Sequence, residues 1–138
     1  VGAYFNPTYP NQLILRFANY DAPSIPARLF DGIVEPGTGL RGQRRALYLL
    51  LEQQAGTKPA PTPPTVTPGR YTISSEQNTE RIFRDAYFWD RHGSSVYASG
   101  SDRTVELTHL DQDWTCGVIF ITHDNGSIQG AFAAPIRR

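Results

Sequence analysis

The sequence predicts an all-β protein, and within that class an antiparallel β-sandwich, with a closed β-barrel as the alternative. Three observations lead to this prediction. Apolar and polar side chains alternate with a period of two after residue 84, turn-forming residues separate the alternating runs, and one run is apolar on both faces. Such strands share an apolar interior when they stack in two layers or close on themselves.

The amino-terminal part is expected to contribute two strands. Residues 12–18 (QLILRFA) alternate, with Ile14 on the face opposite the flanking leucines. Residues 46–54 suit either a strand or a short helix. We favour the strand because a helix of about ten residues has marginal stability. Residues 21–26 and 35–42 are rich in proline and glycine, which predicts loops.

Residues 57–68 (TKPAPTPPTVTP) contain five prolines. Proline fixes φ and lacks an amide donor, so this segment is predicted to be extended and exposed. If it were a linker, the chain would divide into pieces of about 56 and 70 residues, each small for an independent core. We therefore expect residues 1–138 to form a single domain, with a Pro-rich loop at 57–68 that leads into a strand at residues 69–74.

The carboxy-terminal half, residues 84–134, reads as a meander. Asn125 and Gly126 stand between two apolar runs, and both residues tolerate the positive φ of a type I′ hairpin turn. Residues 92–93 and 100–102 carry further turn signals. These turns predict strands that pair with their neighbours in sequence.

Residues 116–121 (CGVIFI) differ from the other predicted strands. Cys116, Val118 and Phe120 point one way and the two isoleucines point the other, so both faces are apolar. We expect this strand to be central in its sheet, or to be covered on its second face by another layer.

Charge and composition exclude some classes of function. The thirteen basic and thirteen acidic residues cancel, so the positive field typical of nucleic-acid binders is absent. No apolar run reaches the roughly 20 residues of a membrane-spanning helix. Cys116 is the only cysteine, which excludes an internal disulfide. The strand-like start at Val1, in a chain without Met, suggests a processed polypeptide.

Three segments carry a resemblance to a known group of proteins. They are PGRYTI, TVELTHL and DNGSIQGAFAAPI, all within residues 68–136. Together they resemble the β-sandwich domains of exported bacterial lipoproteins and other cell-envelope proteins. The resemblance implies an exported, envelope-associated location and structural roles for Gly126, Gly130 and Phe132. It implies no reaction, because that group has no common activity, and Cys116 does not match a lipid-bearing cysteine.

The residues that could carry chemistry have stronger structural explanations. His92, His109 and His123 are separated by seventeen and fourteen residues, which matches no compact zinc spacing. Cys116 lies in an apolar strand, where a thiol is expected as a small core residue rather than as the nucleophile of a Cys/His dyad. We therefore predict no catalytic residue, no metal site and no cofactor.

Acidic residues are expected to stabilise turns. Asp111 and Asp113 flank a short reversal, where Asp side chains commonly accept hydrogen bonds from the backbone. Paired carboxylates also serve glycosidases and calcium sites, but the regular spacing of a calcium loop is absent.

Aromatic and arginine residues give the signal for binding. They cluster in the meander, where successive side chains on a strand face opposite sides, and such residues dominate binding hot spots. The alternative is that both faces are covered and the rings fill the core. The predicted binding residues are Tyr87, Trp89, Arg91, Tyr97, Arg103 and Trp114.

The sequence therefore predicts a non-enzymatic binding or assembly module, exported, that acts through an exposed sheet face, loops or an edge strand. Its expected partner is a protein or a second copy of the chain, with a carbohydrate or an apolar ligand as the other options. The alternative functions are a small β-barrel carrier of an apolar ligand and a small hydrolase with a His/Asp site. A filled core with an apolar surface patch would favour the binding module. A central cavity would favour the carrier, and a cleft that contains His and Asp would favour the hydrolase.

Overall fold

The computed structural model describes residues 1–6, 9–19, 46–54, 65–73, 80–90, 93–96, 102–123 and 126–137. These residues form nine strands and no helix, which confirms the all-β prediction. The strands are β1 (Gly2–Phe5), β2 (Gln12–Ala18), β3 (Ala46–Gln53), β4 (Gly69–Thr72), β5 (Arg81–Asp90), β6 (Gly93–Val96), β7 (Arg103–Leu110), β8 (Trp114–His123) and β9 (Gly126–Arg137).

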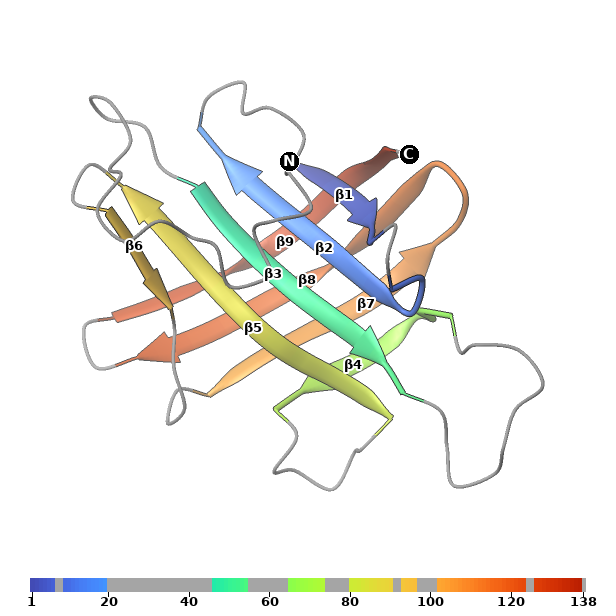
Figure 1. The fold of residues 1–138 in the computed structure, drawn as a ribbon, viewed down its shortest axis with the longest axis horizontal. Coiled ribbons are helices and arrows are strands. Elements are labelled where there is room, and N and C mark those ends of the chain that lie inside the picture. The colour runs from blue at the N-terminus through green and yellow to red at the C-terminus, as the bar shows by residue number, and fades with distance from the viewer. Residues whose placement is uncertain are drawn as a thin grey trace.

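All of these strands except β6 form one closed ring (Figure 1). The order around the ring is β3-β2-β1-β9-β8-β7-β4-β5, and β5 returns to pair with β3. The closed barrel, the alternative in the sequence prediction, is therefore the architecture of this protein, and the two separate sheets of a sandwich are not observed. The physical reason is that β3 pairs along its length with both β2 and β5, which leaves no open edge there.

The strand order departs from a simple meander at β4. The pairs β5–β6, β7–β8 and β8–β9 are antiparallel, as the turn signals predict. However, β4 lies between β5 and β7, antiparallel to β7 and parallel to β5. A second parallel pair joins β1 to β9. The prediction that sequence neighbours pair throughout residues 84–134 is therefore wrong between β6 and β7.

The predicted hairpin between β8 and β9 is confirmed, with a shift in its turn. His123 pairs with Gly126, so Gly126 is the first residue of β9 rather than a turn residue. Asn125 lies outside the described residues.

The ambiguous segment at residues 46–54 forms β3, as predicted. Leu47, Leu49 and Leu51 belong to the core, and the outward Tyr48 and Leu50 are also buried, each 4% exposed. A strand that is apolar on both faces and paired on both edges explains why a leucine-rich sequence is extended here.

Part of the predicted Pro-rich loop lies outside the described residues, which resume at residue 65. Val66 is only 5% exposed and joins the core. The Tyr71 hydroxyl donates to the Thr67 carbonyl at 2.8 Å. The prediction of an exposed segment is therefore wrong for Val66, because Tyr71 draws the chain back onto the end of the barrel. β4 then ends at Thr72.

Apolar side chains fill the described interior of the barrel. They come from alternate positions of every strand of the ring except where a bulge interrupts the alternation. The largest fully buried side chains are Tyr71, Phe83, Leu13, Leu15, Leu49, Leu51, Leu107, Ile121, Val105 and Thr115.

A β-bulge in β5 changes the direction of its side chains. The register with β3 shifts between Leu50 and Leu51, which leaves Arg84 without a partner across the pair. Phe83 therefore faces the core, while Arg84 and Asp85 both face outward.

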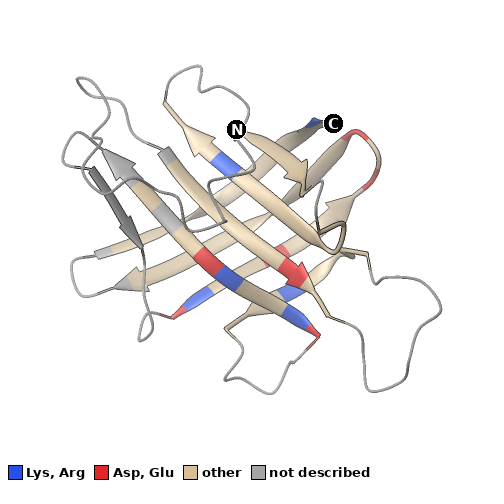
Figure 2. Ribbon diagram, viewed as in Figure 1, with Lys and Arg blue, Asp and Glu red and all other residues tan. Residues whose placement is uncertain are grey.

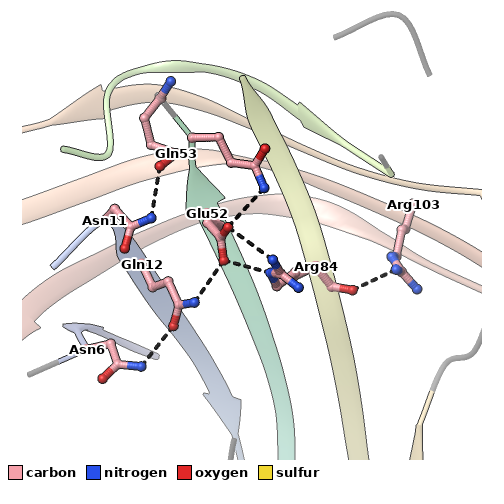
Figure 3. A network of polar contacts seen from close by, with 8 residues as sticks. Asn6, Asn11, Gln12, Glu52, Gln53, Arg84 and Arg103 are labelled. Carbon is pink, nitrogen blue, oxygen red and sulfur yellow. Dashed lines mark hydrogen bonds and ion pairs between the residues drawn. The ribbon is translucent and has the colours of Figure 1, made fainter. Parts of the chain in front are cut away.

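Arg103 bridges a gap in the backbone pairing of the ring. β4 contacts β5 in register only at Thr72 and Ile82, and none of the described strands lies beside the next carbonyls of β5 on that edge. Arg103 donates to the Phe83 carbonyl at 3.2 Å and to the Arg84 carbonyl at 2.8 Å (Figure 3). Its guanidinium carbon also lies 5.4 Å from the centre of the Phe83 ring. A charged side chain thus replaces the missing strand contacts.

We expect Gly117→Ala to destabilise the barrel. A Cβ at Gly117 would overlap the Glu106 carbonyl oxygen and lie 3.0 Å from the Phe132 ring, so β7 or β8 must shift. Overpacking of this kind costs about 1–3 kcal/mol, measurable by urea denaturation. The control is Gly130→Ala, since a Cβ at Gly130 meets nothing within 4 Å. Equal unfolding free energies for the two variants would contradict the packing argument. An unchanged stability of Gly130→Ala would also argue against the structural role that the resemblance implies for Gly130.

We expect Arg103→Met to lower the free energy of unfolding by about 1–3 kcal/mol, because two carbonyls lose a charged donor while the aliphatic stem is kept. The matched control is Arg137→Met at the exposed end of β9. If both variants have the melting temperature of the wild type, the Arg103 hydrogen bonds do not stabilise the gap beside β5.

Candidate functional site

An exposed apolar stripe runs along the outer side of β8 and β9. Trp114 and Val118 are each 48% exposed and Phe120 is 40% exposed. They alternate along β8 with inward residues that are buried, such as Thr115 and Ile121. We call this surface the outer β8–β9 face, and its residues are Trp114, Cys116, Val118 and Phe120 of β8 and Ala131, Ala133 and Pro135 of β9.

The pairing of β8 with β9 keeps these large side chains exposed. Trp114 stands opposite Pro135, and Val118 stands opposite Ala131. Pro135 and Ala131 do not cover these neighbours, so the Trp114 ring and the branched Val118 side chain project from the sheet. Phe120 stands opposite the polar, exposed Gln129, which borders the stripe. On the β7 side, Val118 neighbours the exposed Glu106, which gives the stripe a charged border.

On the opposite wall of the barrel, outward apolar side chains are buried rather than exposed. In Figure 1, β2, β3 and β5 lie in front and β7, β8 and β9 lie behind. The outward Ile14, Tyr48 and Leu50 of the front wall are each only 4% exposed. Among the described residues, outward apolar side chains are therefore exposed on the outer β8–β9 face and covered at these three positions of the front wall.

A tight hairpin fixes the backbone at Trp114. The Asp111 amide donates to the Trp114 carbonyl at 3.0 Å, and Asp111 Oδ1 accepts the amides of Asp113 and Trp114, each at 2.8 Å. His109 Nε2 lies 2.8 Å from Asp111 Oδ2. The Asp113 amide, the His109 ring and the Trp114 amide together lower the pKa of Asp111 to about 2. The turn-stabilising role predicted for Asp111 is confirmed.

The predicted binding residues fall in different places. Trp114 lies on the outer β8–β9 face, whereas Arg103 is half-buried in the gap between β5 and β7. The other four have no described side chain: Tyr87 and Trp89 belong to β5 by their backbone, and Arg91 and Tyr97 lie outside the described residues.

Val118 and Phe120 were not among the predicted binding residues. The signal for them was present, since Cys116, Val118 and Phe120 share one face of a strand whose other face is also apolar. The prediction treated that face as central or covered. β8 is central, between β7 and β9, but Val118 and Phe120 are exposed. Cys116 also points outward and is partly exposed, so the prediction of a core cysteine is wrong.

His109 and Asp111 form the one described pair that a His/Asp hydrolase would need, yet both side chains are about half exposed, at 54% and 51%. They sit on a hairpin rather than in a cleft. His109 is also the register partner of Cys116, but its Nε2 is directed to Asp111. Within the described ranges, no three His, Cys, Asp or Glu residues lie close enough to hold a metal ion.

An apolar hollow of about 330 Å³ opens at the end of the barrel where β2 ends. Phe17, Leu47, Phe88 and Ile128 line it from four strands. The Phe17 ring meets the Phe132 ring edge-on at 5.4 Å between centroids. This hollow is the feature that an apolar-ligand carrier would use.

The chain matches no protein family, no curated protein and no solved structure with which it was compared. The described segments contain no helix long and apolar enough to cross a membrane.

We expect Asp111→Asn to remove a pH-dependent contribution to stability. The folded pKa of about 2 lies below the unfolded value of about 3.9. The carboxylate therefore stabilises the fold fully above that unfolded value, and this contribution is lost as the pH falls toward 2. The difference in unfolding free energy between wild type and variant should shrink across this window.

The control for this titration is Asp113→Asn, because the backbone amide of Asp113, not its carboxylate, takes part in the hairpin contacts. Urea denaturation at a series of pH values reports both differences. A wild-type advantage over Asp111→Asn that stays constant down to pH 2 would contradict the proposed hydrogen bonding.

Proposed function

We propose that this protein is a non-enzymatic binding module that docks onto an apolar surface of another protein through its outer β8–β9 face. The observation that carries the proposal is the exposure of Trp114, Val118 and Phe120 along one side of a rigid central strand. Exposed contiguous apolar surface favours association, and tryptophan is among the residues most enriched in binding hot spots.

Rigidity supports the same function. The Trp114 backbone is held by the Asp111 hairpin, and β8 is paired along its length on both edges. A side chain that is already positioned loses little freedom when a partner binds, so more of the contact energy appears as affinity. The filled described interior fits a module better than a central carrier cavity.

The size of the face favours a transient contact over a stable complex. From Trp114 to Phe120 the strand extends about 20 Å, and two strands are about 10 Å wide, which gives roughly 200–300 Å². Stable dimers commonly bury about 800 Å² on each partner. The outer β8–β9 face alone therefore suits a transient protein partner, or one that also contacts neighbouring parts of this chain.

A carrier of a small apolar ligand is the second candidate, because the hollow lined by Phe17, Leu47, Phe88 and Ile128 has a suitable lining. Its volume of about 330 Å³ lies at the lower end of ligand pockets. For either function we also propose an exported, cell-envelope location, which rests on the resemblance of residues 68–136 to envelope proteins.

We expect the double variant Trp114→Ser, Val118→Thr to lose partner binding. Proteins captured from an extract of the source cells by the immobilised chain would be purified, and their Kd measured by calorimetry. Removing a hot-spot tryptophan should raise the Kd at least about tenfold, since such residues contribute about 2 kcal/mol or more.

The matched control is Tyr9→Ser, Val1→Thr, which removes an aromatic and a valine of similar exposure, 49% and 53%, outside the outer β8–β9 face; Val1 lines the apolar hollow and Tyr9 a polar one. This variant should bind as the wild type does. Unchanged binding by the Trp114 and Val118 variant would contradict the proposal. A native mass spectrum dominated by dimer would point to self-association, and a retained small apolar molecule would favour the carrier.

A further inference from the structure

A polar hollow of about 420 Å³ lies on the outer side of the front wall, at the end of the barrel opposite the apolar hollow. Its lining differs in kind from that of the outer β8–β9 face. Its lining includes Asn6, Tyr9, Gln12, Glu52, Arg84 and Asp85. Charged positions of opposite sign adjoin on β5, near the charged end of β3 (Figure 2).

Glu52 lines this hollow and accepts hydrogen bonds from three neighbouring side chains (Figure 3). Its carboxylate accepts Arg84 Nε at 2.6 Å and Arg84 Nη2 at 3.2 Å. It also accepts Gln12 Nε2 at 2.8 Å and Gln54 Nε2 at 3.2 Å. Asn6 Nδ2 in turn donates to Gln12 Oε1 at 2.8 Å. Side chains from β2, β3, β5 and the segment after β1 are thus locked together.

This arrangement keeps Glu52 ionised despite its burial. Burial alone would raise the pKa of Glu52, but the hydrogen bonds from Arg84, Gln12 and Gln54 outweigh it and lower the pKa below its usual value. The Glu52 side chain is only 8% exposed, whereas that of Arg84 is 49% exposed. Arg84 therefore uses one edge of its guanidinium for Glu52 and presents the rest to solvent.

Stability alone is a weak reason for this construction. An ion pair with one buried member gains little once desolvation is counted. It also coincides with the β5 bulge, which turns both Arg84 and Asp85 outward, and bulges commonly re-aim side chains at functional sites. The bulge places a donor and an acceptor next to each other on the rim of the hollow. The same two residues also line a second hollow of about 350 Å³ on the other side of the bulge.

We propose that the 420 Å³ hollow binds a neutral, polyhydroxylated ligand, a saccharide unit. Each sugar hydroxyl both donates and accepts, which matches the exposed part of the Arg84 guanidinium and the Asp85 carboxylate beside it. Tyr9, 49% exposed, supplies an aromatic ring for the C–H face of the sugar.

The charges of the lining argue against an anion. Glu52 and Asp85 carry two negative charges against the one positive charge of Arg84, and the Glu52 carboxylate is already saturated by the Arg84, Gln12 and Gln54 donors. The volume is within the range of small-ligand pockets, at roughly 300–1,000 Å³. For a ligand of this size and polarity we expect a Kd on the order of 1 mM.

The experiment is a titration of the full ¹⁵N-labelled chain, followed by NMR, with D-glucose, D-mannose, D-galactose and N-acetyl-D-glucosamine in turn. At least one sugar should move the amide signals of Gln12, Glu52, Arg84 and Asp85 along a saturable curve. Asp85→Asn should weaken that binding about tenfold, because a charged acceptor becomes a neutral amide. Asp113→Asn, on the β7–β8 hairpin and not part of the lining of the hollow, is the matched control and should leave the Kd unchanged.

Three outcomes would overturn the proposal. They are the absence of a saturable shift with every sugar, an unchanged Kd for Asp85→Asn in a variant that melts as the wild type does, and preferential binding of tetramethylammonium or inorganic phosphate over the neutral sugars. None of these outcomes bears on the outer β8–β9 face, because the variants used to test the two surfaces share no residue.

Discussion

β3 pairs along its length with β2 on one edge and with β5 on the other, and this double pairing joins what would be two facing sheets into one cylinder. Its inward leucines supply the middle of the core. Its outward Glu52 lies between Gln12 of β2 and Arg84 of β5, so the polar hollow exists only because these three strands are neighbours. The wall that carries the apolar stripe is in turn held in place by the closure of the ring.

The β5 bulge connects the inside of the barrel with its surface. Through its carbonyl, Arg84 accepts a hydrogen bond from Arg103 in the gap beside β4, and through its guanidinium it holds Glu52 on the outer side. Arg84, which has no register partner in β3, therefore contributes both to the gap beside the short β4–β5 pairing and to the polar hollow. This double role accounts for a charged residue at position 84, in the middle of β5.

Local patterns in the sequence predicted individual strands well and their arrangement less well. Alternation located β2 and β8, and the short span of residues 46–54 favoured a strand. A sandwich and a barrel require the same inward alternation, so the pattern could not decide between them. The insertion of β4 beside β5 depends on distant contacts, and nothing in the local sequence marks Arg84 as a bulge. Likewise the sequence showed that both faces of β8 are apolar. It could not show whether another layer of the structure covers Val118 and Phe120.

The parallel pairing of β1 with β9 has a consequence for how the molecule is made. Ala3 lies beside Ile136, so the last seam of the cylinder joins segments from the two ends of the described chain. During translation, β1 leaves the ribosome long before β9 exists, and the edge of β1 that pairs with β9 stays unpaired until then. Such high contact order slows folding and prolongs the time in which a nascent chain depends on chaperones.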